Sequence, residues 1–322
     1  MAQKRDASMD FLRLIATIAV VGLHSVRKCA DMTALHTAAF YALQFAVPVF
    51  FMCSGYFMLN RASISWRSLG RKLLGLLRVA VFWEIVLLFT NPISSWSSMR
   101  WQPMGWHLWF LGALAGVYLL TPATLWLLRC KGTRALVGML CALGAVCVAL
   151  HTITLFTGSP WYNDIPQYLL LWDWMFYYLL GLAMRRIEPW LRRHISLPLN
   201  AVLLAAAMLA DLFGHHLLVQ RYDIMPQLYY DTPVKMLYCL LLFALIHRLD
   251  LRSRLAKIVA ALEPLSMGCF LIHPFVQRLV FEFVPQPASL GAFVWWWILC
   301  AVSFALSWLF HRFAFSRLLI SI

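Results

Sequence analysis

The chain alternates long apolar stretches with short polar breaks, and the apolar stretches set the architecture. Ten of them are about 20 residues long, enough for a helix to cross roughly 30 Å of hydrocarbon. They run over residues 8–27, 37–59, 72–91, 106–128, 134–152, 167–185, 197–219, 231–249, 262–284 and 291–312. The pattern predicts an all-α bundle of about ten membrane-spanning helices.

A β-barrel is the other structure that can cross a bilayer, and the pattern does not fit it. Barrel strands alternate apolar and polar residues over about ten positions. Runs such as AVVGL, FALIH and LLAAAMLA lack that alternation. Composition agrees with helices in a bilayer, because 62% of the residues are hydrophobic and only 12% are charged. No repeat or long loop divides residues 1–322, so we expect a single membrane domain.

The basic residues give an orientation to this bundle. Lysine and arginine concentrate in short loops on the cytoplasmic side of membrane proteins. Of the 27 lysine and arginine residues, only four lie in the loops of the opposite set, namely Arg27, Lys28, Arg100 and Arg221. Both ends of the chain are therefore predicted to be cytoplasmic. The net charge of +14 follows from this topology, and basic residues scattered over many loops do not suggest binding of nucleic acid.

Several absences narrow the class of protein. Six of the eight cysteines fall inside predicted spans, so neither a disulfide framework nor a metal site is expected. The first apolar stretch contains Arg13 and His24 and no small-residue cleavage site follows it, which favours a retained helix over a signal peptide. No GxSxG, HExxH, P-loop or dinucleotide motif occurs in the sequence.

Ionisable residues inside the spans are the most informative feature, because each destabilises a membrane helix unless it is paired or lines a wet cavity. Arg13 and His24 are 11 residues apart, close to three whole turns, so they share a helix face about 16 Å apart along the axis. One interpretation makes Arg13 a positioner of an anionic group and His24 a general base. The other is packing and snorkelling of two side chains near the membrane surfaces.

The inner and outer ends of the spans differ in charge. Arg71, Lys72 and Arg78 crowd the predicted cytoplasmic end of the third span, where they would suit a phosphate-rich cytosolic ligand or simply anchor the helix. Polar groups of both signs lie toward the outer half. Candidate substrate-binding residues are Ser54, Tyr56, Glu84, His107, Trp109, Asp173, His273 and Arg278. Helix packing explains Ser54 and Tyr56 equally well, and an aromatic belt explains Trp109.

Several of these segments together resemble the acyltransferase-3 superfamily of bacterial surface-polysaccharide O-acyltransferases. They are LRLIATIAVVGLH with Arg13 and His24, FFMCSGY with Ser54 and Tyr56, the basic start of the third span, HLWFLGALAGVYLLTP and LSMGCFLIHPFV. The resemblance covers nearly the whole chain and matches the short, single-domain members. The third-span match is looser, because Lys72 replaces an arginine and no proline follows Arg78.

The resemblance implies an O-acetyltransferase in the bacterial inner membrane. Acetyl-CoA from the cytosol would donate the acetyl group, and a hydroxyl of a lipid-linked or surface glycan would accept it. Arg13 and His24 would be essential, with Arg71, Lys72 and Arg78 binding CoA. His24 would act as general base or as a transient acyl carrier, and no metal is implied. A transporter or flippase for a glycan or anionic metabolite is the competing class, and an inactive sensory or scaffold protein is a third possibility.

Overall fold

Each apolar stretch predicted from the sequence lies mostly on helix. The structure is a computed structural model, and it describes residues 6–27, 34–61, 63–90, 108–158, 165–222, 230–251, 254–283 and 291–320. These residues contain no strand. The α-helices are α1 (Ala7–Arg27), α2 (Ala34–Leu43), α3 (Ala46–Met58), α4 (Trp66–Thr90), α6 (Trp109–Thr157), α7 (Leu171–His194), α8 (Leu197–Tyr222), α9 (Pro233–His247), α10 (Arg254–Leu262), α11 (Ser266–Phe283), α12 (Gly291–Arg312) and α13 (Ala314–Ile320). Two short 3₁₀ helices are η2 (Gln167–Leu169) and η3 (Glu263–Leu265).

Three of the predicted spans differ from continuous, separate helices. The stretch 37–59 is divided into α2 and α3 by a turn at Gln44 and Phe45. The fourth and fifth spans form the two arms of α6, which kink at Gly132, where φ is 58° and only glycine is comfortable. The ninth begins in η3, whose Pro264 stands in its first turn and separates α10 from α11. Glycine thus marks the second of these changes of direction and proline the third.

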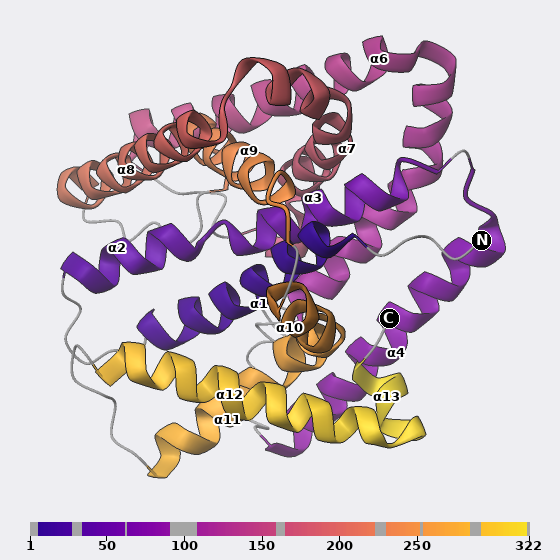
Figure 1. Cartoon of the computed structure of the whole chain (residues 1–322), viewed down its shortest axis with the longest axis vertical. Helices are drawn as coiled ribbons and strands as arrows, with labels where there is room; N and C mark the ends of the chain where they lie inside the picture. Colours follow the sequence, from indigo (N-terminus) through magenta and orange to yellow (C-terminus); the bar gives the residue numbers. More distant parts are fainter. Residues whose placement is uncertain are drawn as a thin grey trace.

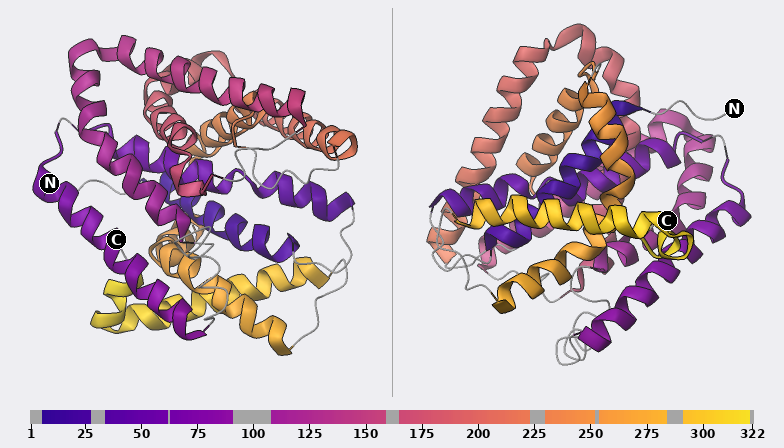
Figure 2. Two further views of the ribbon diagram at one scale, coloured as in Figure 1. Left: turned by 180° about the vertical axis from the view of Figure 1, so that it is seen from behind. Right: turned by 60° about the horizontal axis from the view of Figure 1, so that its bottom comes forward.

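Helix α1 is at the centre of the bundle and contacts α2, α3, α9, α10, α11 and α12. The most apolar window of α1 is 72% buried, compared with 11% for α6 and 22% for α12. Figures 1 and 2 show α8 and one arm of α6 along one edge, α12 along the other, and α1 between them. The outer helices expose their apolar side chains, as helices facing lipid do.

Helices α3 and α7 pack closely because each has a glycine at the crossing. A Cβ atom added to Gly55 would lie 1.7 Å from the carbonyl oxygen of Tyr178, and one added to Gly181 would lie 1.9 Å from that of Met52. Any larger residue would push the two backbones apart. Gly55 in the FFMCSGY segment is therefore a packing residue, and this crossing fixes the position of its neighbour Ser54.

Among the described residues, six helical stretches are long and apolar enough to cross a membrane, the 49-residue α6 counting as one. Helices α4 and α7, which carry several basic residues, are not among them. Ile320 in the last helix lines the same cavity as Arg13 in the first, so the first and last helices of the described chain meet at this cavity. Ten crossings with both ends in the cytoplasm stay a prediction.

Candidate functional site

A cavity of about 320 Å³ lies at the Arg13 end of α1, between α1, α3, α4, α6 and the segment that leads into α11. It is lined by Arg13, Thr17, Phe50, Ser54, Lys72, Phe110, Leu114, Tyr118, Glu263, Pro264, Ser266, Met267, Phe270 and Ile320. The lining combines charged and hydroxyl groups with aromatic and aliphatic side chains. The cavity therefore brings together Arg13, Ser54 and Lys72, which the sequence singled out on three separate segments.

Arg13 is held in this cavity by contacts of three kinds. Its guanidinium lies 3.1 Å from a carboxylate oxygen of Glu263 and 4.0 Å from one of Asp10. It also stands 5.0 Å from the centre of the Phe57 ring, a cation–π distance. The Arg13 side chain is 33% exposed and that of Glu263 is 16% exposed, so the pair faces the cavity. A ligand in the cavity can therefore contact the guanidinium directly.

The three basic residues at the start of α4 lie differently. Lys72 is half-buried, lines the cavity and has its ammonium group 5.9 Å from the centre of the Tyr118 ring. Arg71 and Arg78 are exposed on the surface of the helix. One helical residue is enough to turn a side chain away from a cavity, because successive residues are about 100° apart. The structure therefore sets Lys72 apart from its two basic neighbours.

Within FFMCSGY, Ser54 and Tyr56 lie in different surroundings. Ser54 lines the cavity, where its side chain is hydrogen-bonded to Tyr118. The Tyr56 hydroxyl instead lies 3.1 Å from Nε2 of His247, and Arg185 stacks over its ring at 5.2 Å. Tyr56 is thus part of a second polar group, away from the residues that line the cavity.

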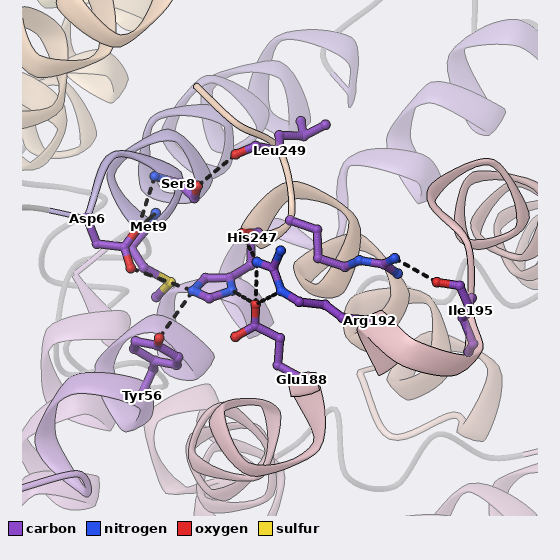
Figure 3. A network of polar contacts seen from close by, with 10 residues as sticks. Asp6, Ser8, Met9, Tyr56, Glu188, Arg192, Ile195, His247 and Leu249 are labelled. Atoms are coloured by element: carbon purple, nitrogen blue, oxygen red, sulfur yellow. Dashed lines mark hydrogen bonds and ion pairs between the residues drawn. The ribbon is translucent and has the colours of Figure 1, made fainter. Parts of the chain in front are cut away.

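That second group, shown in Figure 3, joins the first residues of the described chain to the ends of α7 and α9. His247 Nδ1 lies 2.9 Å from Glu188, and its Nε2 lies 3.6 Å from Asp6. Glu188 is also paired with Arg192. The hydrogen bond with His247 is the largest of several effects that hold the pKa of the Asp6 carboxyl below its usual value of 3.8. Asp6 accepts backbone N–H bonds from Ser8 and Met9, so the group also caps α1.

His24, at the other end of α1, is in direct contact with His273 of α11. His24 Nδ1 and His273 Nε2 are 2.7 Å apart, the ring centres are 5.0 Å apart and the ring planes differ by 13°, so the two rings meet edge to edge and nearly coplanar. His273 is 1% exposed, and its Nδ1 lies 2.7 Å from the carbonyl oxygen of Phe270. The sequence predicted both histidines as site residues, but it did not predict that they touch.

The His24 end of α1 is also fixed through its backbone. The carbonyl of His24 belongs to the last turn of the helix, where carbonyl groups have no helical N–H partner. Gln277, which is 1% exposed, donates a hydrogen bond of 2.8 Å from its amide nitrogen to this carbonyl. Helix α11 therefore holds both the ring and the main chain of His24.

An aromatic side chain lies between the cavity and the histidine pair. Phe270 lines the cavity, and its ring centre is 6.1 Å from that of His273. It also packs edge-on against Phe110, which lines the cavity as well. The two ends of the candidate site are thus separated by a single layer of side chains at this point.

The remaining candidates that the structure describes neither line the cavity nor belong to the His24–His273 pair. Asp173 is buried on α7 and accepts a hydrogen bond from the thiol of Cys147. Trp109 packs against Trp174, with the two ring centres 5.2 Å apart, and does not line the cavity. Glu84 is half-buried on α4, and Arg278 is exposed on α11. His107 lies outside the described residues.

Three residues of the site were not singled out in the sequence. Glu263 falls at the start of the predicted ninth span, where an acidic residue followed by proline is a signal for a helix boundary. Tyr118 and Phe270 are aromatic residues in apolar runs and give no signal at all. They become site residues only because α6 and α11 meet at the cavity.

Comparison with known proteins gives one match. A family model described as an acyltransferase domain, of the acyltransferase-3 superfamily, matches residues 6–312. No curated protein and no solved structure matches the chain. The matched range contains every residue of the cavity except Ile320, together with both histidines.

Proposed function

Since the chain belongs to the acyltransferase-3 superfamily, we propose that it moves an acetyl group from cytosolic acetyl-CoA to a hydroxyl of a lipid-linked or cell-surface glycan. The family and the apolar helices make it a multi-pass membrane acyltransferase. The observation that carries the proposal is that Arg13 and His24 occupy two ends of one central helix, Arg13 in a cationic cavity and His24 beside a second histidine. We place the protein in the bacterial cytoplasmic membrane.

The cavity suits the donor substrate. Acetyl-CoA combines anionic phosphates with a long, mixed polar and apolar arm that ends in a thioester. Arg13 and Lys72 supply positive charge, Thr17 and Ser54 supply hydroxyl groups, and aromatic rings complete the lining. Charge-assisted hydrogen bonds to phosphate are strong in a poorly hydrated site. Glu263 would compete for Arg13 until an anionic group displaces it.

His24 supplies the chemistry at the acceptor end. A glycan hydroxyl attacks the thioester carbonyl while the imidazole of His24 takes the hydroxyl proton. The carbon–sulfur bond then breaks, and the proton leaves with the thiolate, so that the products are an acetyl ester and CoA. A transient acetyl-histidine would give the same products in two steps. Arg13 is about 16 Å away along the helix and would act only on the donor.

Replacing His24 tests the proposal. Purified protein in lipid vesicles would be given acetyl-CoA with a radiolabelled acetyl group and glycan extracted from the producing cells. We expect His24→Ala to lower transfer at least about 100-fold, because a general base contributes roughly that much or more. His216 is an exposed histidine on α8, so His216→Ala is the matched control. Mass spectrometry of the glycan would identify the added group and the acceptor. Near-normal transfer by folded His24→Ala would overturn the proposal.

A further inference from the structure

Pro274 leaves a hydrogen-bond acceptor inside α11, beside His24. In a regular helix the N–H of residue 274 would donate to the carbonyl of Phe270, four residues earlier. Proline has no N–H, so this carbonyl lacks its helical partner although the helix continues on both sides of Pro274. The Nδ1 atom of His273 lies 2.7 Å from this carbonyl oxygen and 3.3 Å from that of Cys269. The ring of His273 thus takes the position of the missing donor.

This contact determines where the hydrogen atom of His273 lies. A carbonyl oxygen can only accept, so Nδ1 of His273 must carry the hydrogen. The ring is 1% exposed, and its partners are two carbonyls and an imidazole, none of which offers a negative charge to offset a buried cation. A neutral ring with hydrogen on Nδ1 has its lone pair on Nε2, the atom that faces His24.

The same reasoning then applies to His24. His273 Nε2 is an acceptor, so the 2.7 Å contact requires His24 Nδ1 to be the donor. The neutral ring of His24 therefore has its lone pair on Nε2. That is the form a general base or acyl acceptor needs, with the reactive nitrogen on the side of the ring away from His273.

We propose that His273 is a positioning residue that fixes the tautomer and orientation of His24, and that Pro274 makes this possible by freeing the carbonyl of Phe270. The proposal rests on the acetyltransferase function proposed above. It extends that function by assigning roles to two residues that need not touch the substrate. In a catalytic triad a carboxylate orients the catalytic histidine through a hydrogen bond. Here His273 would orient His24 in the same way, and the carbonyl of Phe270 would in turn orient His273.

Three substitutions separate positioning from packing. His273→Asn is too short to reach His24. His273→Gln can place its amide oxygen near the position of Nε2 and accept the same hydrogen bond. Pro274→Ala restores a backbone N–H to the Phe270 carbonyl and so competes with His273 for it. Each variant would be assayed for acetyl transfer with both substrates varied, and for thermal unfolding in detergent.

We expect His273→Asn to lower kcat about 10- to 100-fold, with KM for acetyl-CoA within about twofold of wild type, because binding of the donor is not involved. His273→Gln should recover most of kcat. Pro274→Ala should lower kcat severalfold without lowering thermal stability. A purely structural role would instead lower stability in all three variants and show no rescue by glutamine. Wild-type kcat in a folded His273→Asn, or no rescue in a folded His273→Gln, would overturn the proposal.

A measurement without turnover distinguishes this proposal from the proposed function. Nitrogen NMR of protein labelled at histidine, with His24→Ala and His273→Asn used for assignment, reports which ring nitrogens are protonated. We expect hydrogen on Nδ1 of both histidines near neutral pH. Hydrogen on Nε2 of His24 would overturn the positioning role even if transfer is observed. Absence of acetyl transfer in the wild type, with the expected tautomers, would count against the function alone.

Discussion

Among the described residues, the Arg13–Glu263 and Lys235–Asp211 pairs each join a basic and an acidic residue inside the bundle, and they differ in how far they are buried. The Arg13–Glu263 pair has an N–O distance of 3.1 Å and side chains that are 33% and 16% exposed. The Lys235–Asp211 pair has an N–O distance of 2.5 Å and side chains that are 0% and 2% exposed. Both involve a charge inside a predicted span, so the sequence marks them equally. Exposure therefore separates the Arg13–Glu263 pair, called here the open pair, whose cation faces a cavity, from the Lys235–Asp211 pair, the closed pair, whose cation is fully buried.

The closed pair has the contacts of a structural link. The ammonium of Lys235 also donates to the main-chain carbonyl of Tyr41, whose ring stacks on His215 at 4.3 Å. These contacts join α2, α8 and α9. A charge in hydrocarbon is expensive, and here the expense is offset by bonds from three helices. We therefore expect changes to this pair to affect folding first, and changes to the open pair to affect activity first.

The largest effect is expected from breaking the closed pair. Lys235→Met leaves the carboxylate of Asp211 buried without its cation, which should destabilise the fold by about 3–5 kcal/mol. Thermal unfolding in detergent and the yield of folded protein would measure this. Lys235→Met combined with Asp211→Leu removes both charges and should recover much of the loss. A wild-type unfolding temperature for Lys235→Met alone would contradict the structural role.

Breaking the Arg13–Glu263 pair should lower activity strongly and stability little. Arg13→Gln should lower acetyl transfer by about two orders of magnitude, because it removes the charge that we propose binds the donor. Its unfolding temperature should stay close to that of the wild type, since partly exposed pairs contribute at most about 1 kcal/mol. Glu263→Gln keeps the guanidinium and should lower activity far less. If Arg13→Gln unfolded as easily as Lys235→Met, the distinction between the pairs would be lost.

A smaller effect tests whether facing the cavity also distinguishes two neighbouring residues of α4. Lys72 lines the cavity, whereas Arg71 is exposed. Lys72→Gln should raise KM for acetyl-CoA about tenfold with little change in kcat. The reason is that the lost contact would stabilise the bound donor equally in the ground state and in the transition state. Arg71→Gln should raise KM less, through long-range attraction alone, and this rise should disappear at high salt. Equal effects would mean that the donor binds along the surface of α4.

The smallest effect concerns the half-exposed pair of Asp6 and His247. Because the pKa of Asp6 is lowered in the folded protein, its contribution to stability is present above its ordinary pKa near 3.8 and is lost as pH falls through the lowered value. Asp6→Asn should therefore lower the unfolding temperature slightly at neutral pH and not at strongly acidic pH. Thermal unfolding measured across this range checks the sign, and a difference that grows with acidity would contradict it.

Much of the helical architecture was predictable from the sequence. Apolar runs of about 20 residues gave the helices, because their length and composition depend only on neighbours along the chain. The spacing of Arg13 and His24 placed them at two ends of one helix for the same reason. The family could also be identified from local motifs, and the family model confirms it over residues 6–312.

Contacts between distant segments could not be read in this way. His24 meets His273 and Arg13 meets Glu263 across some 250 residues of sequence. The sequence grouped Asp173 with the site, whereas the fold places it beside Cys147. It treated Arg71, Lys72 and Arg78 alike, whereas the rotation of α4 leaves one of them in the cavity.

The sequence by itself determined which residues form helices and which carry charge into the membrane, because hydropathy and helical periodicity are properties of consecutive residues. Only the tertiary structure decided which of those charges are enclosed, which face a cavity, and which nitrogen of His24 holds its lone pair. The last depends on a carbonyl freed by Pro274 and on the ring of His273. Helix packing brings these groups within hydrogen-bonding distance, and no spacing along the chain encodes that distance.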